Sequence, residues 1–380
     1  MKRPFALIGI TYLSVQAALF YLESDLAAAI LTAVCFIGTI VSLFILKNRN
    51  LRHTVLGFCL TAAFASTIFS GYNIFVKQPI VDKYSEREIY VTATVLEQPT
   101  VQYDTYRYLI ETDSINGKIE KLKICLSTIN ELNVEEFDRI SCVLPLKECT
   151  KSQMIADGAF LQASVNKNFA YIVKKTDDKP LYYQAVKIRE NFADSFEQNM
   201  LQDCASLCRA VLLGEKTALS QEIQNDFTRC GVSFLIVVSG MHLAIISSFV
   251  FLCIKKIIKN RVLRSMIMLM CAFSFIAVTG FAPSVVRAGV MLAVVYSGKI
   301  FMRKGDSLNS LGIAALILTV PNPTAVADVG MLLSFTATLG IILWARKISV
   351  YIMGKFAKLK RLKKPVEFTV NLFAVSVSAA

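Results

Sequence analysis

The sequence predicts a polytopic α-helical membrane protein with a small β-rich domain inserted on the extracytoplasmic side. Three observations support this fold class. Hydrophobic residues make up 54% of the 380 residues and charged residues only 18%, whereas soluble domains average about 45–50% and about 25%. The apolar residues gather in runs that approach membrane-spanning length. One long segment between these runs alternates polar and apolar residues, as strands do. This composition excludes a disordered chain and a small disulfide scaffold.

The formal net charge of +13 indicates membrane orientation. Residues 77–203 carry 16 Lys and Arg against 20 Asp and Glu, a net charge of −4, so the other residues hold a net charge of +17. That excess sits in short loops between apolar runs, where Lys and Arg mark the cytoplasmic side of a membrane. The charge therefore does not indicate a nucleic-acid-binding patch on a soluble domain.

Three apolar runs precede the β-rich segment. Residues 5–22 and 26–46 predict a helical hairpin, because no convincing signal-peptide cleavage site separates them. The third run, residues 54–76, follows the basic loop 47–52. The positive-inside rule then places the N-terminus in the cytoplasm and the segment after residue 76 outside.

Five further apolar runs follow the β-rich segment, and basic loops alternate with uncharged ones between them. Several runs are shorter than the roughly 20 residues of a straight span, so we expect some broken or tilted helices that pack inside protein. A new apolar stretch, residues 368–380, follows a basic tail, and we expect the chain to be the front part of a longer protein. The five runs are residues 232–254, 266–281, 283–298, 308–320 and 329–344.

The β-rich segment predicts a small barrel or sandwich, because several short alternating runs lie within about 90 residues. Residues 156–166 are open between strand and helix. The predicted strands are residues 88–97, 105–112, 118–127, 137–146 and 169–173. Residues 181–200 then change to helical periodicity, and this helix lies either on the barrel or on the outer membrane face. Its predicted apolar stripe is Tyr182, Val186, Phe192, Phe196 and Met200.

Polar residues inside the apolar runs are candidate functional residues. Ser239 and His242 are three positions apart and share a face in a helix, and Gly240 between them allows a break or a close helix contact. His242 either serves the function or only hydrogen-bonds a backbone carbonyl. Arg287 needs a partner or a water-filled path, unless it snorkels to the outer surface. Asp328 and Ser334 frame the last outward-facing loop, where Asp328 either serves the function or is no more than a helix N-cap.

These residues bring in a resemblance to a known family. Their order and spacing resemble the signature of the ComEC-type competence DNA-uptake channel family, and the β-rich segment is similar to that family's OB-like domain. Phe234 and Leu332 depart from the pattern, where His and Gln are common. The matching residues are Leu212-Leu213-Gly214-Glu215, Phe227, Gly231, Ser239-Gly240-Met241-His242, Pro283-Ser284-Val285-Val286-Arg287-Ala288, Met291, Pro323, Asp328, Gly330 and Leu333-Ser334-Phe335.

The resemblance implies a multi-pass inner-membrane channel that passes single-stranded DNA into the cytoplasm. It also implies four segments: three N-terminal membrane helices in 1–76, an external OB-like domain in 77–180, amphipathic or linker helices in 181–231, and an incomplete competence-type membrane domain in 232–380. The implied pore or motif residues are Gly214, Gly231, Ser239, Gly240, His242, Pro283, Arg287, Asp328, Gly330 and Ser334.

The family usually carries an external metallo-β-lactamase-like nuclease domain, and this chain contains no such domain. No His-x-His-x-Asp-His pattern occurs, and the two His of the chain, His53 and His242, cannot build a two-metal site. We therefore expect no enzymatic activity, metal or cofactor. The implied partners are single-stranded DNA, membrane lipid, a DNA receptor, a cytoplasmic motor and, as further alternatives, a separate nuclease chain or further copies of this chain.

Cysteines of the external segment lie in an oxidising compartment, where Cys125 with Cys142 or with Cys149 is a candidate disulfide. Other function classes stay open. A small-molecule secondary transporter predicts an internal repeat, but the first membrane block has three runs and the second five. A membrane-embedded hydrolase would use Ser239 and His242, although two residues one turn apart on one helix are a poor catalytic arrangement. A non-functional fragment is the last alternative.

Overall fold

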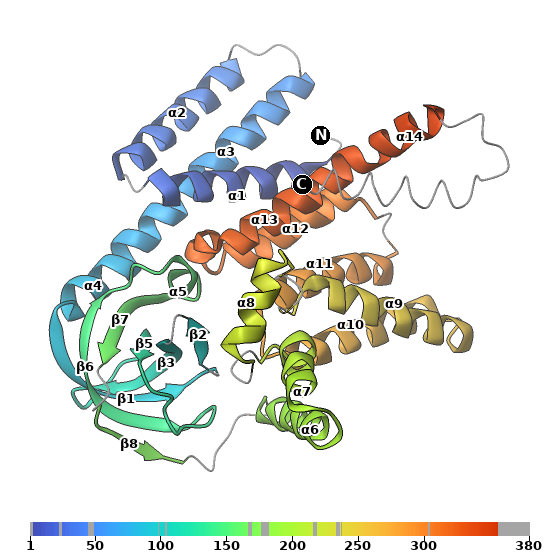
Figure 1. Cartoon of the computed structure of the whole chain (residues 1–380). Helices are drawn as coiled ribbons and strands as arrows, with labels where there is room; N and C mark the ends of the chain where they lie inside the picture. The colour runs from blue at the N-terminus through green and yellow to red at the C-terminus, as the bar shows by residue number, and fades with distance from the viewer. Residues whose placement is uncertain are drawn as a thin grey trace. The chain divides into compact units, whose positions relative to one another are not determined.

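The computed structural model describes residues 3–22, 25–44, 49–97, 99–102, 105–165, 169–175, 182–215, 219–232, 236, 238–302 and 305–355. The apolar stretch 368–380, the basic tail from Lys358 onward and Phe234 lie outside the described residues. Helices and a β-barrel make up the described chain and confirm the predicted fold class (Figure 1). The chain divides into two compact units, Met1–Phe69 with Ser297–Ala380, and Ser70–Tyr296.

The barrel lies in the unit Ser70–Tyr296 and closes from five strands. β1 (Arg87–Val95) pairs with β3 (Thr105–Ile115), β3 with β5 (Lys123–Thr128), β5 with β7 (Ala159–Val165), β7 with β6 (Arg139–Glu148), and β6 again with β1. All these pairs are antiparallel except β5 with β7. The short strands β2 (Thr100–Gln102) and β4 (Lys118–Ile119) pair with β3, and β8 (Tyr171–Lys174) pairs with β6.

Alternating apolar residues fill the barrel, as their spacing predicts. Ile89, Val91, Ala93 and Val95 of β1 all belong to its buried core. The segment 156–166, open between strand and helix in the sequence, contains β7 over Ala159–Val165, which follows the short helix α5 (Ser152–Ala156). The prediction of one strand over 118–127 is wrong, because only β4 and β5 form there. Residues 120–122 between them bond instead to Thr112, whose hydroxyl donates to the Glu120 carbonyl and accepts from the Leu122 amide.

Helices complete the unit Ser70–Tyr296. In chain order they are η1 (Asn73–Lys77), α4 (Gln78–Tyr84), α6 (Tyr183–Asn199), α7 (Gln202–Cys208), η2 (Arg209–Leu213), α8 (Gln221–Arg229), α9 (Gly240–Ile257), α10 (Arg261–Val278) and α11 (Pro283–Ile300), whose last turn passes into the other unit. The sequence predicts a run from residue 232, but α9 starts only at Gly240. Ser239 has extended backbone angles and stands at the N-cap position.

The predicted apolar stripe of α6 is only partly buried. Val186 is buried, but Phe192 is 51% exposed and Met200 44% exposed. The face of α6 that packs against protein consists of Val186, Arg189 and Ala193. A charged residue, Arg189, thus occupies the buried side of α6, and the predicted stripe did not include it.

The other unit combines helices from both ends of the chain. They are α1 (Pro4–Leu22), α2 (Asp25–Phe44), α3 (Arg49–Tyr72), which runs on into η1, and then α12 (Ser307–Thr319), η4 (Pro323–Ala327), α13 (Val329–Gly340), η5 (Ile341–Ala345) and α14 (Arg346–Lys355). α1 and α12 approach so closely that a Cβ atom on Gly9 would lie 2.1 Å from the Gly312 carbonyl oxygen. Arg3 and Asp306 form an ion pair between the starts of the same two helices, with 2.7 Å between Nε and Oδ2.

Five helices in the described part of the chain are long and apolar enough to cross a membrane, which makes this a multi-pass membrane protein. α12 and the segment Ile30–Ile40 of α2 are shorter apolar helices. α11, which carries the buried Arg287, is not among the five. The five are Pro4–Leu22, Leu51–Tyr84, Gly240–Ile257, Arg261–Val278 and Val329–Tyr351.

Candidate functional site

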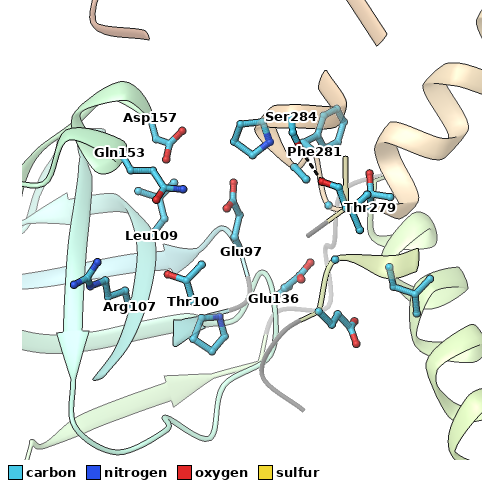
Figure 2. Close-up of a pocket in the computed structure, with 18 of the residues that line it drawn as sticks. Glu97, Thr100, Arg107, Leu109, Glu136, Gln153, Asp157, Thr279, Phe281 and Ser284 are labelled. Atoms are coloured by element: carbon cyan, nitrogen blue, oxygen red, sulfur yellow. Dashed lines mark hydrogen bonds between the residues drawn. The ribbon is translucent and has the colours of Figure 1, made fainter. Parts of the chain in front are cut away.

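A cavity of about 480 Å³ opens between the barrel and the helices of the unit Ser70–Tyr296. Figure 2 shows Glu97, Thr100 and Asp157 on the barrel side of this cavity. On the other side it shows Phe281 of the α10–α11 turn and Ser284 in the first turn of α11. The cavity therefore brings together segments that lie almost 190 positions apart in the sequence, between Glu97 and Ser284.

Two of the motif segments line this cavity, and a third starts next to it. Gly214, at the end of η2, and Pro283, at the start of α11, both line it. The Ser284 hydroxyl donates to the carbonyl oxygen of Val238 over 2.7 Å, which ties α11 to the residue that precedes Ser239. The structure thus brings together motif residues from 212–215, 239–242 and 283–288.

The contact between α9 and α11 depends on a glycine. A Cβ atom on Gly240 would lie 2.8 Å from the Cβ of Ala288, closer than packed carbon atoms approach. Below this contact, Val238, Leu243 and Val285 share a buried apolar cluster with residues of α10. The small residue in the motif is therefore needed for helix packing, as expected at a close helix contact.

Ser239 and His242 form the N-terminal cap of α9. The Ser239 amide donates to Nδ1 of His242 over 3.1 Å, and the Ser239 hydroxyl oxygen lies 3.2 Å from the same nitrogen. A side chain at the third helical position that accepts from the N-cap amide is one half of a capping box. The two residues do share a face, and their spacing has a structural role at the helix end.

Arg287 lies inside its unit. The residue is 8% exposed and stands on α11 between the buried residues Val285 and Gly289. The guanidinium therefore does not snorkel to the surface of the unit, and the alternative expectation, a partner within the protein or a water-filled path, is the one that agrees with this burial.

Gly231 ends helix α8. Its φ is +71°, its amide donates to the Thr228 carbonyl, and the Val232 amide donates to the Phe227 carbonyl over 2.9 Å. This pair of bonds is a Schellman motif, which favours glycine at the left-handed position. Phe227 and Gly231, both part of the family signature, thus have a role in ending α8.

The last group of motif residues lies in the other unit. Asp328 caps α13 as expected, because its Oδ1 accepts from the Gly330 amide over 2.9 Å. Ser334 lies on the same helix, six residues after Asp328. These residues belong to the unit Met1–Phe69 with Ser297–Ala380, whereas the cavity belongs to Ser70–Tyr296.

A buried ion-pair network, absent from the sequence-based candidates, borders the cavity. Arg189 of α6 pairs with Glu136, in the loop between β5 and β6, and its Nε lies 3.1 Å from Oε1 of Glu215. Glu215 also pairs with Arg209, whose Nη2 lies 2.8 Å from Oε2, and Arg209 pairs with Glu197. Glu136, Arg189 and Glu215 are all buried.

Charge is retained at the centre of this network. Burial lowers the pKa of Arg189, but Glu136 and Glu215 raise it by more, so its guanidinium stays protonated. Burial also raises the pKa of Glu136, because desolvation outweighs the attraction of Arg189. We take the pair as ionised, since a guanidinium has no neutral form at physiological pH and two carboxylates flank it.

A row of aromatic rings runs beside the ion pairs. Phe137 meets Tyr182 edge-on with 5.8 Å between ring centroids, and Tyr182 meets Phe281 in the same way at 5.1 Å. Burial, and less strongly the charge of Glu136, raises the pKa of Tyr182 to about 12, so the phenol stays neutral. Phe137 and Phe281 both have positive φ, at 70° and 53°, which is uncommon for bulky residues.

One sequence signal points to Arg189, but none points to its partners. Arg189 lies three positions after Val186 and four before Ala193, so it sits on the apolar face of an amphipathic helix. A buried Arg requires a carboxylate partner. Glu215 stands in the Leu212–Glu215 motif segment, but nothing in the sequence pairs it with residue 189.

Cys125, Cys142 and Cys149 are free buried thiols, and the strand order separates Cys125 from Cys142. β7 lies between β5, which carries Cys125, and β6, which carries Cys142 and leads to Cys149. Strands two apart are separated by roughly 9–10 Å, beyond the Cα separation of about 4.4–6.8 Å in a disulfide. Cys142 also belongs to the barrel core, whereas Cys125 alternates with the core residues Ile124 and Leu126. The disulfide stays a prediction, and this arrangement disfavours the pairing of Cys125 with Cys142.

Burial raises the pKa of Cys142 to about 11 and also raises the pKa of Cys125 and of Cys149, which keeps all three sulfurs in the thiol form. Within the residues that the structure describes, no three His, Cys, Asp or Glu side chains gather closely enough to hold a metal ion.

Comparisons with known proteins agree with the motif residues. Residues 211–380 match the family model described as "Competence protein". "ComE operon protein 3" of Bacillus subtilis (strain 168) is 25% identical over 162 residues, which cover 42% of this chain and 21% of that relative. The chain thus matches about a fifth of the length of this curated relative. No solved structure matches.

Proposed function

We propose that this chain, whose residues 211–380 match the family model described as "Competence protein", forms part of an inner-membrane channel for single-stranded DNA during natural transformation. The observation that carries this proposal is that two motif segments, 212–215 and 283–288, line one cavity, and that the third, 239–242, starts directly after it. Gly214, Pro283 and Ser284 line this space, and so does Val238, the residue that precedes Ser239.

The proposed orientation follows from the charges of the loops. Lys255 and Lys256 lie in the last turn of α9, and Lys299 lies in the last turn of α11, with Arg303 and Lys304 following in the sequence, so we assign these ends to the cytoplasm. The α10–α11 turn, and with it the cavity, then lies on the outer side together with the barrel. DNA would meet this side first.

We do not assign DNA binding to the barrel. Residues 77–203 carry a net charge of −4, which does not attract a strand of phosphates. We infer that the barrel organises the channel or meets a protein partner such as the DNA receptor. The contacts with the strand are assigned to the membrane part, where His242 and Arg287 are the polar candidates.

Nuclease activity is not part of this proposal. The matched family domain is the membrane part, and a nuclease acting on the strand would be supplied by another domain or chain. A hydrolase built on Ser239 and His242 has no specific support, because their contact is that of a helix cap.

Substitutions at His242 and Arg287 test the channel. We expect His242→Ala and Arg287→Ala at the chromosomal locus to lower transformation frequency at least tenfold, with the amount of protein in the membrane within twofold of the parent. His53→Ala is the matched control for histidine, since His53 is exposed on α3, and Arg261→Ala is the matched control for arginine.

His242→Gln separates capping from transport. Gln at the third helical position still accepts from the N-cap amide, so this variant keeps the cap and removes the imidazole. The proposal expects His242→Gln to fail in uptake, as His242→Ala does. Normal uptake in His242→Gln would assign the residue to helix capping alone, and normal uptake in Arg287→Ala as well would remove both from the DNA path.

A further inference from the structure

Arg189 joins three segments of the chain that are distant in sequence. Its guanidinium pairs with Glu136 from the barrel and with Glu215 from the segment that ends η2. A Cβ atom on Gly280, in the α10–α11 turn, would lie 2.7 Å from Nη1 of the same guanidinium. One side chain therefore contacts the barrel, a motif segment and the membrane turn, and it is only 4% exposed.

The loop that carries Glu136 is hydrogen-bonded to the barrel. The Phe137 amide donates to the Val95 carbonyl over 2.9 Å, and the Val95 amide donates to the Asp138 carbonyl over 3.0 Å. These bonds fasten the loop that carries Glu136 to the end of β1. The position of Glu136 is thus fixed relative to strand β1 of the barrel.

The aromatic row provides a second connection between the same segments. Phe137 of the barrel loop, Tyr182 at the start of α6 and Phe281 of the membrane turn contact one another in series. Phe137, Gly280 and Phe281 all have positive φ. Non-glycine residues keep such backbone angles only where the surrounding structure holds them, and they cluster at functional sites.

We propose that Arg189 is a positioning residue that holds the β-barrel against the α10–α11 turn and so fixes the mouth of the cavity where the motif residues meet. The role requires Arg. Its planar guanidinium reaches two carboxylates in different directions at once, whereas a Lys ammonium is a compact charge that reaches one of them well. The inference about DNA uptake rests on the proposed function, but the inference about positioning does not.

A photocrosslink between barrel and turn measures the positioning directly. Thr100 of β2 lies on the barrel side of the cavity, opposite Phe281. We would place p-benzoylphenylalanine at position 100 in the full chain, irradiate membranes, and quantify by mass spectrometry the crosslinks to the peptide that contains residues 279–284. Arg189→Gln is expected to lower this crosslink at least fivefold per folded molecule, and Arg189→Lys to lower it two- to threefold.

Lys187→Gln is the matched control, because Lys187 is an exposed cation on the same helix and lies outside the network. It should leave the crosslink unchanged. An unchanged crosslink in folded Arg189→Gln would overturn the positioning role. If Arg189→Gln does not accumulate in the membrane, Arg189→Lys decides, and a crosslink equal to that of the parent would overturn the proposal.

Transformation frequency of the same strains distinguishes this inference from the proposed function. Loss of both the crosslink and DNA uptake supports both. Loss of the crosslink with normal uptake supports the positioning role of Arg189 but contradicts the idea that the channel depends on it. A normal crosslink with normal uptake in Arg189→Gln contradicts the inference and leaves the channel proposal to the His242 and Arg287 variants.

Discussion

Gly280 shows how a single missing side chain shapes the site. Its φ of +67° lies in the left-handed region, and the space that a Cβ would fill is occupied by the Arg189 guanidinium. Two separate costs therefore oppose any larger residue there, one from the backbone and one from the displaced charge. A displaced guanidinium would weaken its buried ion pair with Glu136, whereas Glu215 would keep its pair with Arg209.

Gly280→Ala is accordingly expected to destabilise the protein by about 1–2 kcal/mol from the backbone alone, and by more if Arg189 moves. The melting temperature of the detergent-purified protein measures this effect. Gly298→Ala in α11 is the control, because nothing lies within 4 Å of its Cβ position and its φ is ordinary. Equal melting temperatures for Gly280→Ala and the parent would contradict the assigned geometry.

The contact with α11 fixes the position of helix α9. Gly240 faces Ala288 with no room for a methyl group between them, and the Ser284 hydroxyl bonds to the Val238 carbonyl next to this contact. Motif residues on two helices thus specify one helix crossing. Their separation along the sequence gives no hint of this, because helix contacts depend on the third dimension.

Gly240→Ala should disturb this crossing, because its new Cβ would lie 2.8 Å from the Ala288 Cβ. We expect lower transformation frequency with a measurable fall in the amount of membrane protein. Ala288→Gly removes the opposing methyl group and should restore both in the double variant. A double variant that is no better than Gly240→Ala would show that the contact with Ala288 is not the cause.

The cap of α13 gives a second prediction for an element. Asp328→Ala removes the acceptor for the Gly330 amide and is expected to lower stability by roughly 1 kcal/mol, whereas Asn keeps the acceptor. Thermal unfolding of Asp328→Ala and Asp328→Asn would measure the difference. If both variants lose the same stability, the charge of Asp328 matters more than its capping oxygen.

Orientation in the membrane is a property of the whole molecule. The positive-inside rule places the barrel outside and the loop after α11 inside. A reporter enzyme that is active only outside the cytoplasm is expected to be active when inserted at the exposed turn Asn116-Gly117, and inactive when inserted at Gly305. The opposite pattern would reverse the assigned topology, and with it the side on which DNA reaches the cavity.

Much of the fold could be predicted from the sequence because it depends on local patterns. Apolar runs indicated the membrane helices, and period-two alternation indicated β1 and β3. The departures have local causes. α9 starts at Gly240 because Ser239 and His242 cap it there, and the strand over 118–127 is divided because Thr112 bonds to residues 120 and 122.

The candidate site was predictable only in part. Sequence order identified Gly214, Ser239, Gly240, His242, Pro283 and Arg287, since a signature is read along the chain. Arg189 and Glu136 escaped detection, because nothing in a linear pattern relates residue 136 to residue 189 or to residue 215. The sequence by itself determined the helices, the barrel and the motif residues. Only the tertiary structure decided which buried charges meet, because such pairing depends on the low-dielectric interior that folding creates around them.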